Sequence, residues 1–167
     1  LAPEYSSGYS FRAESYIGLR RYEEAVDAIA RALAAGYDDK AFSLMQEVPD
    51  SAMAPLVEKL RMQSAENPGN GYWPYCLGAV YEAQGAYRTL IACYMDSQKK
   101  SPSSVTAYRI SNCYSETGDF ASALKHIDFA IALDSTDYGN IMAKADLLYE
   151  SGDAEAAISE LDRYVAH

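Results

Sequence analysis

The sequence predicts an all-α protein built as a solenoid of about five antiparallel helix hairpins. Three glycines, Gly85, Gly118 and Gly152, follow one another at steps of 33 and 34 residues, and each ends a similar motif. Between them, apolar residues recur every three or four positions, as they do on one face of a helix. A fixed period of this length is typical of one helical hairpin repeated along a chain rather than of a single globular core.

The five expected hairpins follow one another over nearly the whole chain. They span residues 6–35, 38–67, 71–100, 104–133 and 138–166 of a single array. The second hairpin is degenerate, because only residues 40–48 are available for its first helix before Pro49 turns the chain into a second helix over residues 51–66.

The turns inside the hairpins carry residue types that suit a reversal between helices. Glycine adopts left-handed backbone angles at low cost, so Gly118 and Gly152 fit the end of a first helix. Asp119 and Asp153 follow directly. A carboxylate at this position caps the next helix and complements its positive end, so we expect both aspartates to be caps.

The motif begins with a bulky residue and a small residue, followed by an aromatic residue. A glycine turn and a second aromatic residue come next, and the motif ends with further small and bulky residues. In the third hairpin these positions hold Leu77, Gly78, Tyr81, Gly85, Tyr87, Leu90, Tyr94 and Ser97. In the fourth they hold Ile110, Ser111, Tyr114, Gly118, Phe120, Ala123, Ile127 and Ala130. The pattern resembles the tetratricopeptide repeat over roughly residues 6 to 166. This resemblance implies a right-handed α-α superhelix whose first helices line a concave side, where partners usually bind.

The resemblance also implies which side chains point into the concave groove, at steps of three, four and three residues along each first helix. The candidate partner-binding residues are Tyr72, Tyr75, Glu82, Tyr108, Arg109, Asn112, Met142, Asp146 and Tyr149. The first hairpin offers Ser7, Ser10, Glu14 and Ile17 at the same positions. We expect the tyrosines to supply affinity, and Arg109, Asn112 and Asp146 to set the register. The alternative is that the tyrosines only pack against one another and fill the groove.

The charge balance limits the partner. With 14 basic and 24 acidic residues, the net charge is −10, which disfavours nucleic acid and anionic membranes as partners. A neutral or basic protein or peptide is therefore favoured over an acidic one. No apolar run is long enough to span a bilayer, so we expect a soluble chain without membrane insertion.

The residue patterns of catalysis and of cofactor binding are missing, so we expect a protein that is not an enzyme and binds no cofactor or metal. Cys76, Cys93 and Cys113 lack metal-ligand spacing. His126 and His167 are the only histidines, and no nucleophile elbow or phosphate-binding glycine loop occurs. For His126, on a predicted second helix, a structural role is favoured.

Two other functions stay open. Leu161, Tyr164 and Val165 leave the last helix apolar, whereas a terminal repeat normally has a polar outer face. The chain could therefore join copies of itself through its terminal helices, the C-terminal helix above all. It could also be the recognition segment of a larger multidomain enzyme or receptor. Residue 1 is Leu, not Met, so we expect a segment of a longer chain from which any targeting segment has been removed, and the compartment stays open.

Overall fold

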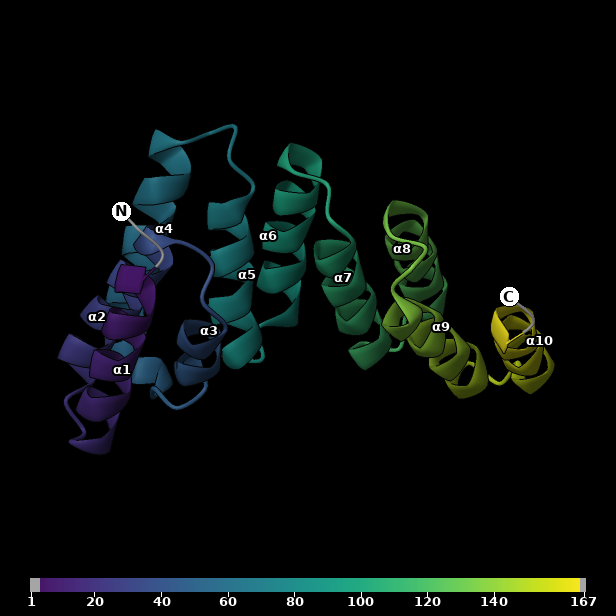
Figure 1. Ribbon diagram of the computed structural model, residues 1–167, viewed down its shortest axis with the longest axis horizontal. Coiled ribbons are helices and arrows are strands. Elements are labelled where there is room, and N and C mark those ends of the chain that lie inside the picture. The colour runs from purple at the N-terminus through teal and green to yellow at the C-terminus, as the bar shows by residue number, and fades with distance from the viewer. Residues whose placement is uncertain (1–3, 166–167) are drawn as a thin grey trace. The chain divides into compact units, whose positions relative to one another are not determined.

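The computed structural model describes residues 4–165, with side chains from Ser6 onward, and every regular element in that range is helical (Figure 1). The elements in chain order are α1 (Glu4–Gly18), α2 (Tyr22–Ala35), α3 (Asp39–Met45), the 3₁₀ helix η1 (Asp50–Ala52), α4 (Ala54–Glu66), α5 (Tyr72–Ala83), α6 (Tyr87–Lys100), α7 (Ser104–Glu116), α8 (Phe120–Leu133), α9 (Tyr138–Glu150) and α10 (Ala154–Val165). Three pairs of consecutive helices pack as hairpins: α1 with α2, α7 with α8, and α9 with α10. The predicted all-α class is confirmed.

The chain divides into two compact units, the first unit (Leu1–Cys93) and the second unit (Tyr94–His167), with the boundary inside α6. The first unit has a core of long aliphatic side chains such as Ile29, Leu33 and Leu56. A core cluster among the described residues of the second unit contains Ala107, Ala123, Ile127, Ala130 and Leu147. Small residues such as these alanines let paired helices approach closely.

The reversals inside the hairpins share one backbone conformation. Gly85, Gly118 and Gly152 have φ of 65°, 77° and 93°. The N–H of each donates to the carbonyl three residues earlier, at the end of the first helix. The predicted glycine reversals are confirmed. In the first hairpin the same place and the same hydrogen bond belong to Arg20, with φ of 58°, so here an L-residue occupies the left-handed region.

Both predicted aspartate caps are confirmed. The Oδ1 atom of Asp119 accepts the backbone N–H of Ser122 at 3.1 Å at the start of α8. Asp153 does the same for Ala156 at 3.0 Å at the start of α10. Each carboxylate satisfies one of the first helical N–H groups, which have no partner inside the helix.

The second hairpin departs from its expected bounds. Its first helix, α3, ends at Met45 rather than at residue 48, and its second helix, α4, begins at Ala54 rather than at residue 51. Residues 50–52 form η1 between them. Val48 and Met53 are buried in the core of the first unit, so the connection packs its own apolar side chains instead of extending either helix. Among the described residues, no helix has both the length and the apolar character needed to cross a bilayer.

Candidate partner-binding surface

Tyr75 of α5 belongs to an aromatic cluster inside the first unit. It is only 6% exposed. The Phe42 ring meets it edge-on with the ring centroids 5.5 Å apart. Tyr37 completes the cluster, with its centroid 6.5 Å from that of Tyr75 and 5.2 Å from that of Phe42. The sequence places Tyr75 in an open groove, whereas the structure uses most of its surface for packing.

Tyr72, one turn earlier on α5, has a structural role of its own. Its hydroxyl donates to the backbone carbonyls of Leu33 at 3.1 Å and Gly36 at 2.8 Å. Leu33 lies in the last turn of α2 and Gly36 is its C-cap, so this hydroxyl ties α5 to the C-terminal end of α2. Burial raises the pKa of Tyr72, so the phenol stays protonated and able to donate. Glu82, the third candidate on α5, is half-buried and has an interaction of its own.

Ser10, expected in the groove of the first hairpin, is fully buried in a polar network. The hydroxyls of Ser6 and Ser10 donate to Asp38 Oδ2 at 2.5 Å and 2.8 Å, and Asp38 Oδ1 accepts the N–H of Ala41 at 3.0 Å. Burial alone would raise the pKa of Asp38, but the hydrogen bonds from Ser6, Ala41 and Ser10 outweigh it and lower the pKa below its ordinary value. The network joins α1 to the start of α3.

Sequence reasoning missed two exposed aromatic residues of the first unit, Phe11 and Tyr37. The Nζ atom of Lys40 lies 4.3 Å from the centre of the Phe11 ring and 2.8 Å from Glu14 Oε2. Phe11 follows Ser10 by one position, and Tyr37 lies between two hairpins, outside the repeated motif. For Tyr37 the sequence does offer a signal, because it is an aromatic residue directly before the degenerate hairpin. The repeat motif makes no prediction at that position.

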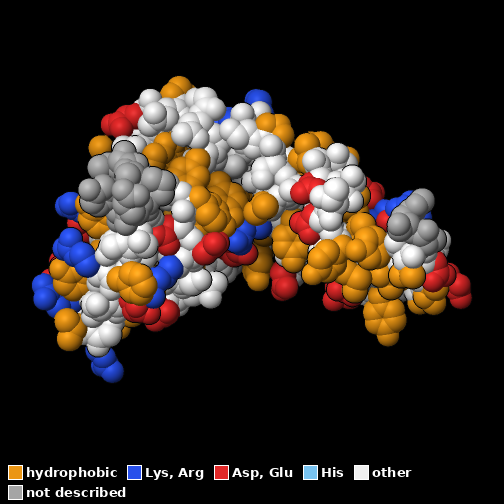
Figure 2. Space-filling model, in the orientation of Figure 1, with side chains coloured by type: hydrophobic (Ala, Val, Ile, Leu, Met, Phe, Trp, Pro, Cys, Tyr) orange, Lys and Arg blue, Asp and Glu red, His pale blue; other side chains and the backbone are white. Residues whose placement is uncertain are grey.

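In the second unit, α9 presents three of the predicted residues on one open face. Met142 is 44% exposed and Tyr149 is 71% exposed, and Asp146 lies between them at helical spacing. Hydrophobic side chains gather over α9 on the face shown in Figure 2. Lys144, the only basic residue on α9, binds elsewhere, because its Nζ atom contacts Asp128 of α8 at 2.9 Å and Glu160 of α10 at 3.2 Å.

The predicted residues on α7 are half-buried rather than open. Tyr108 packs against the core of the second unit, and Arg109 has an interaction of its own. Asn112 makes no side-chain hydrogen bond within residues 4–165. Val105, one turn before Tyr108, is 49% exposed. Six of the inward repeat positions of these two helices form what we name the α7–α9 face: Val105, Tyr108, Asn112, Met142, Asp146 and Tyr149.

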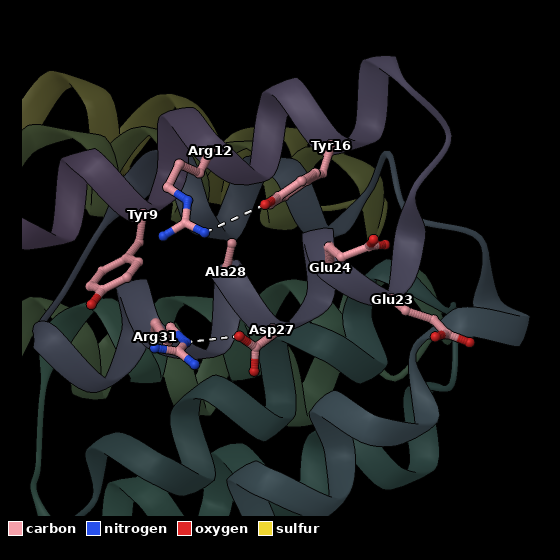
Figure 3. A pocket seen from close by; sticks show the side chains of 8 residues that line it. All are labelled: Tyr9, Arg12, Tyr16, Glu23, Glu24, Asp27, Ala28 and Arg31. Atoms are coloured by element: carbon pink, nitrogen blue, oxygen red, sulfur yellow. Dashed lines mark hydrogen bonds and ion pairs between the residues drawn. The ribbon is translucent and has the colours of Figure 1, made fainter.

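One of the pockets lies on the α7–α9 face, and another lies in the first unit. The smaller one, of about 150 Å³, lies between the first turns of α7 and α9 and is lined by Val105, Tyr108, Asp137, Gly139 and Asn140. The larger one, of about 410 Å³, lies between α1 and α2 (Figure 3). In the larger pocket, Arg31 donates to Asp27 at 2.8 Å, and Arg12 donates to the Tyr16 hydroxyl at 3.4 Å. Its lining includes three acidic residues and two basic ones, Glu23, Glu24, Asp27, Arg12 and Arg31.

Burial changes the pKa values of His126 and Cys76. The His126 ring stacks on Tyr114 with centroids 5.6 Å apart, and burial, together with nearby Lys125, lowers its pKa. Burial raises the pKa of Cys76 to about 12, so its thiol stays protonated at neutral pH. Within residues 4–165, no group of three His, Cys, Asp or Glu residues is placed to hold a metal ion. His167 lies outside the described residues.

The last helix, α10, carries a second exposed apolar surface. Ile158 is 55% exposed and Val165 is 82% exposed, seven residues apart on the same side of the helix. Tyr164 is also exposed, and Leu161 is half-buried. A stripe at this spacing is the apolar side of an amphipathic helix.

No protein-family model matches the sequence, and no curated protein matches it. Solved structures do match. MamA is similar with a TM-score of 0.63 at 10% sequence identity, over 92% of each chain. TTC0263, a thermophilic TPR protein of Thermus thermophilus, is similar with a TM-score of 0.57 at 18% identity, over 95% of this chain and 89% of that one. The chain has the tetratricopeptide-repeat fold.

Within the tetratricopeptide-repeat fold, the predicted site residues divide between the two units. Tyr72, Tyr75 and Glu82 lie in the first unit and are engaged in its packing or in other interactions. In the second unit, the half-buried residues are Tyr108, Arg109 and Asn112, and the exposed ones are Met142, Asp146 and Tyr149. The openly accessible part of the predicted site is therefore on α9.

Proposed function

We propose that this tetratricopeptide-repeat chain is a protein-interaction scaffold that binds an extended peptide or a segment of a partner protein on the α7–α9 face. The observation that carries the proposal is the exposure of Met142 and Tyr149 beside Asp146 on one side of α9. Clustered exposed apolar side chains destabilise a soluble surface unless they are used, and they commonly mark interaction sites. Asp146 and Asn112 supply polar groups that have no partner within residues 4–165.

The predicted residues take different parts in this proposal. Tyr149 and Met142 supply apolar contact, Tyr108 forms the floor between the two helices, and Asn112 and Asp146 fix the register of the bound chain. Tyr72 and Tyr75 hold the first unit together rather than make the main contacts, and Glu82 and Arg109 are not among the main contacts. Neither catalysis nor a cofactor enters the proposal.

The proposed partner is neutral or basic. The second unit contains six basic and twelve acidic residues. Of the basic ones, Lys144 is already paired with two carboxylates. A basic segment would be attracted to this unit, whereas an acidic one would be repelled.

The proposal is tested by affinity capture from native lysate with quantitative mass spectrometry. The wild type is compared with Met142→Ala/Tyr149→Ala and with a control, Phe129→Ala/Leu133→Ala, which removes two exposed apolar residues from α8. We expect a protein that is retained by the wild type and the control but lost from the α9 variant. Thermal melts establish that all three chains fold alike. The same captured proteins for all three would contradict the proposal.

A second function, self-association through α10, is favoured by the exposure of Ile158 and Val165. Joining two such apolar stripes would bury both. Light scattering over a range of concentrations tests this idea, with Ile158→Asp as the disrupting variant and Ser159→Asp as the control on the neighbouring exposed position. A wild type that stays monomeric at the highest concentration would rule it out.

A further inference from the structure

The small pocket between α7 and α9 has the size of one side chain. Its volume is about 150 Å³, below the roughly 300–1,000 Å³ of typical small-molecule sites. An apolar cavity of about 150 Å³ is known to admit a group as large as benzene. Val105 and Tyr108 supply its apolar wall from α7. The pocket therefore suits a single apolar side chain better than a whole metabolite.

A buried polar group lines the same pocket. Asn140 is only 3% exposed, and its Nδ2 atom donates to Asp137 Oδ2 at 3.3 Å. Its Oδ1 atom accepts no hydrogen bond within residues 4–165. Asp137 is held in place as well, because its Oδ1 atom accepts the N–H of Gly139 at 2.9 Å. The pocket thus combines an apolar wall with a fixed acceptor suited to a backbone N–H.

Among the described residues, Asp137 is the only charged one that lines this pocket. On α9 and its N-terminal cap, the carboxylates are Asp137, Asp146 and Glu150. The one basic residue of the helix, Lys144, contacts α8 and α10 through its ammonium group instead of leaving it free for a ligand. A cationic side chain of a ligand that crosses α9 would meet carboxylates with no competing cation on that helix.

We propose that the pocket anchors one aliphatic side chain of a basic peptide. The backbone N–H of the anchor residue donates to Asn140 Oδ1, and a Lys or Arg a few residues away lies along Asp146. The inference rests on the proposed function, since it names the chemistry of the partner on the α7–α9 face. One aliphatic side chain fits the volume of the pocket, and a Lys or Arg a few residues away suits the charge of the carboxylates on α9.

The test uses the whole chain and fluorescein-labelled twelve-residue peptides. In each peptide, one Leu and one Lys are separated by zero to four degenerate positions, and binding is read by fluorescence anisotropy. We expect at least one spacing to bind, and a change of its Leu to Ala to weaken binding at least about tenfold, the effect of losing one buried aliphatic side chain. Changing the Lys of that peptide to Glu, with its Leu kept, should also weaken binding.

Two variants of the protein localise the effect. Val105→Phe fills the pocket from a half-exposed position and should weaken binding about tenfold or more, whereas Phe129→Ala on α8 should not. Asp146→Lys should abolish the preference for Lys over Glu, whereas Asp162→Lys on α10 should keep it. Both controls change residues that are exposed in the folded chain.

The outcomes separate the pocket from the wider face. If Met142→Ala/Tyr149→Ala abolishes peptide binding and Val105→Phe does not, the pocket inference is wrong while the proposed function stands. If no spacing binds the wild type, or if binding is indifferent to the Leu, the inference is also wrong, and the lysate capture then decides the proposed function by itself. Loss of binding in both variants, with the controls intact, supports the inference.

Discussion

The predicted groove positions of α5 in the first unit and of α9 in the second unit are used in opposite ways. In the first unit, Tyr72 is hydrogen-bonded to the end of α2 and Tyr75 is buried against Phe42. In the second unit, Met142 and Tyr149 lie open on α9. The difference teaches that a groove position of the repeat does not have one fixed role. Its role depends on which side chains the neighbouring hairpin places against it.

The fully buried serines of the two units have different hydrogen-bond partners. The first unit holds a carboxylate network in which two serines and a backbone N–H converge on Asp38. In the second unit, Ser111 makes a simple buried bond from its hydroxyl to the carbonyl of Ala123 at 2.8 Å. The first unit therefore depends on a charged group in a part-buried place, whereas this bond of the second unit is neutral and insensitive to pH.

The largest expected effect on stability comes from replacing a buried tyrosine of the first unit with alanine, compared with the same change at an exposed tyrosine of the second unit. Tyr75→Ala should lower the free energy of unfolding by about 3 kcal/mol, because it removes a buried aromatic ring and leaves a cavity. Tyr149→Ala should change it by no more than about 0.5 kcal/mol, as an exposed substitution does. Chemical denaturation of both variants measures the contrast. Equal losses in the free energy of unfolding for the two variants would contradict the difference between the units.

A smaller effect is expected at Asp38. Asp38→Ala should cost about 2 kcal/mol, because the hydroxyl of the buried Ser10 loses its acceptor and α3 loses its cap. The control is Glu47→Ala, at an exposed carboxylate of the same unit. Asp119→Ala in the second unit removes a cap but no buried partner, so it should cost less than Asp38→Ala. Urea melts of the three variants measure the order of these losses in stability.

The same carboxylate predicts a pH dependence. The pKa of Asp38 is lowered in the folded protein from its ordinary value of 3.8, so the unfolded chain binds the proton more readily. The stabilisation is complete above the ordinary value and is lost as the pH falls through the lower folded value. Urea melts between pH 5 and about pH 2 should show this loss in the wild type and a shallower one in Asp38→Ala. Parallel curves would show that Asp38 does not contribute to the acid sensitivity.

The smallest effect concerns the turns. Arg20→Gly should raise the stability by about 0.5 kcal/mol, because glycine relieves the left-handed strain but also makes the unfolded chain more flexible. Gly118→Ala, at the equivalent turn of the second unit, should lower it by about 1 kcal/mol for the same steric reason. Differential scanning calorimetry of both variants tests whether the two turns are alike in energy as they are in hydrogen bonding. A loss of stability in Arg20→Gly would contradict the strain argument.

The open half of the site was within reach of the sequence because it depends on helical spacing alone. Met142, Asp146 and Tyr149 lie at steps of four and three, and the structure places them on one exposed side of α9. Asn140 was missed, since its position is outside the inward series and its importance comes from a pocket shared with α7. No pattern along one helix encodes such a pocket.

The sequence by itself determined the helices outside the second hairpin, the glycine turns at Gly118 and Gly152, and the caps at Asp119 and Asp153, because each depends on the backbone and a few nearby residues. Tertiary structure decided which tyrosines are accessible. Tyr75 is covered by Tyr37 and Phe42, residues more than thirty positions away, and their approach depends on how the short second hairpin packs. Burial is a property of neighbours in space, so the spacing that places a side chain on one face of a helix does not determine whether that face stays open.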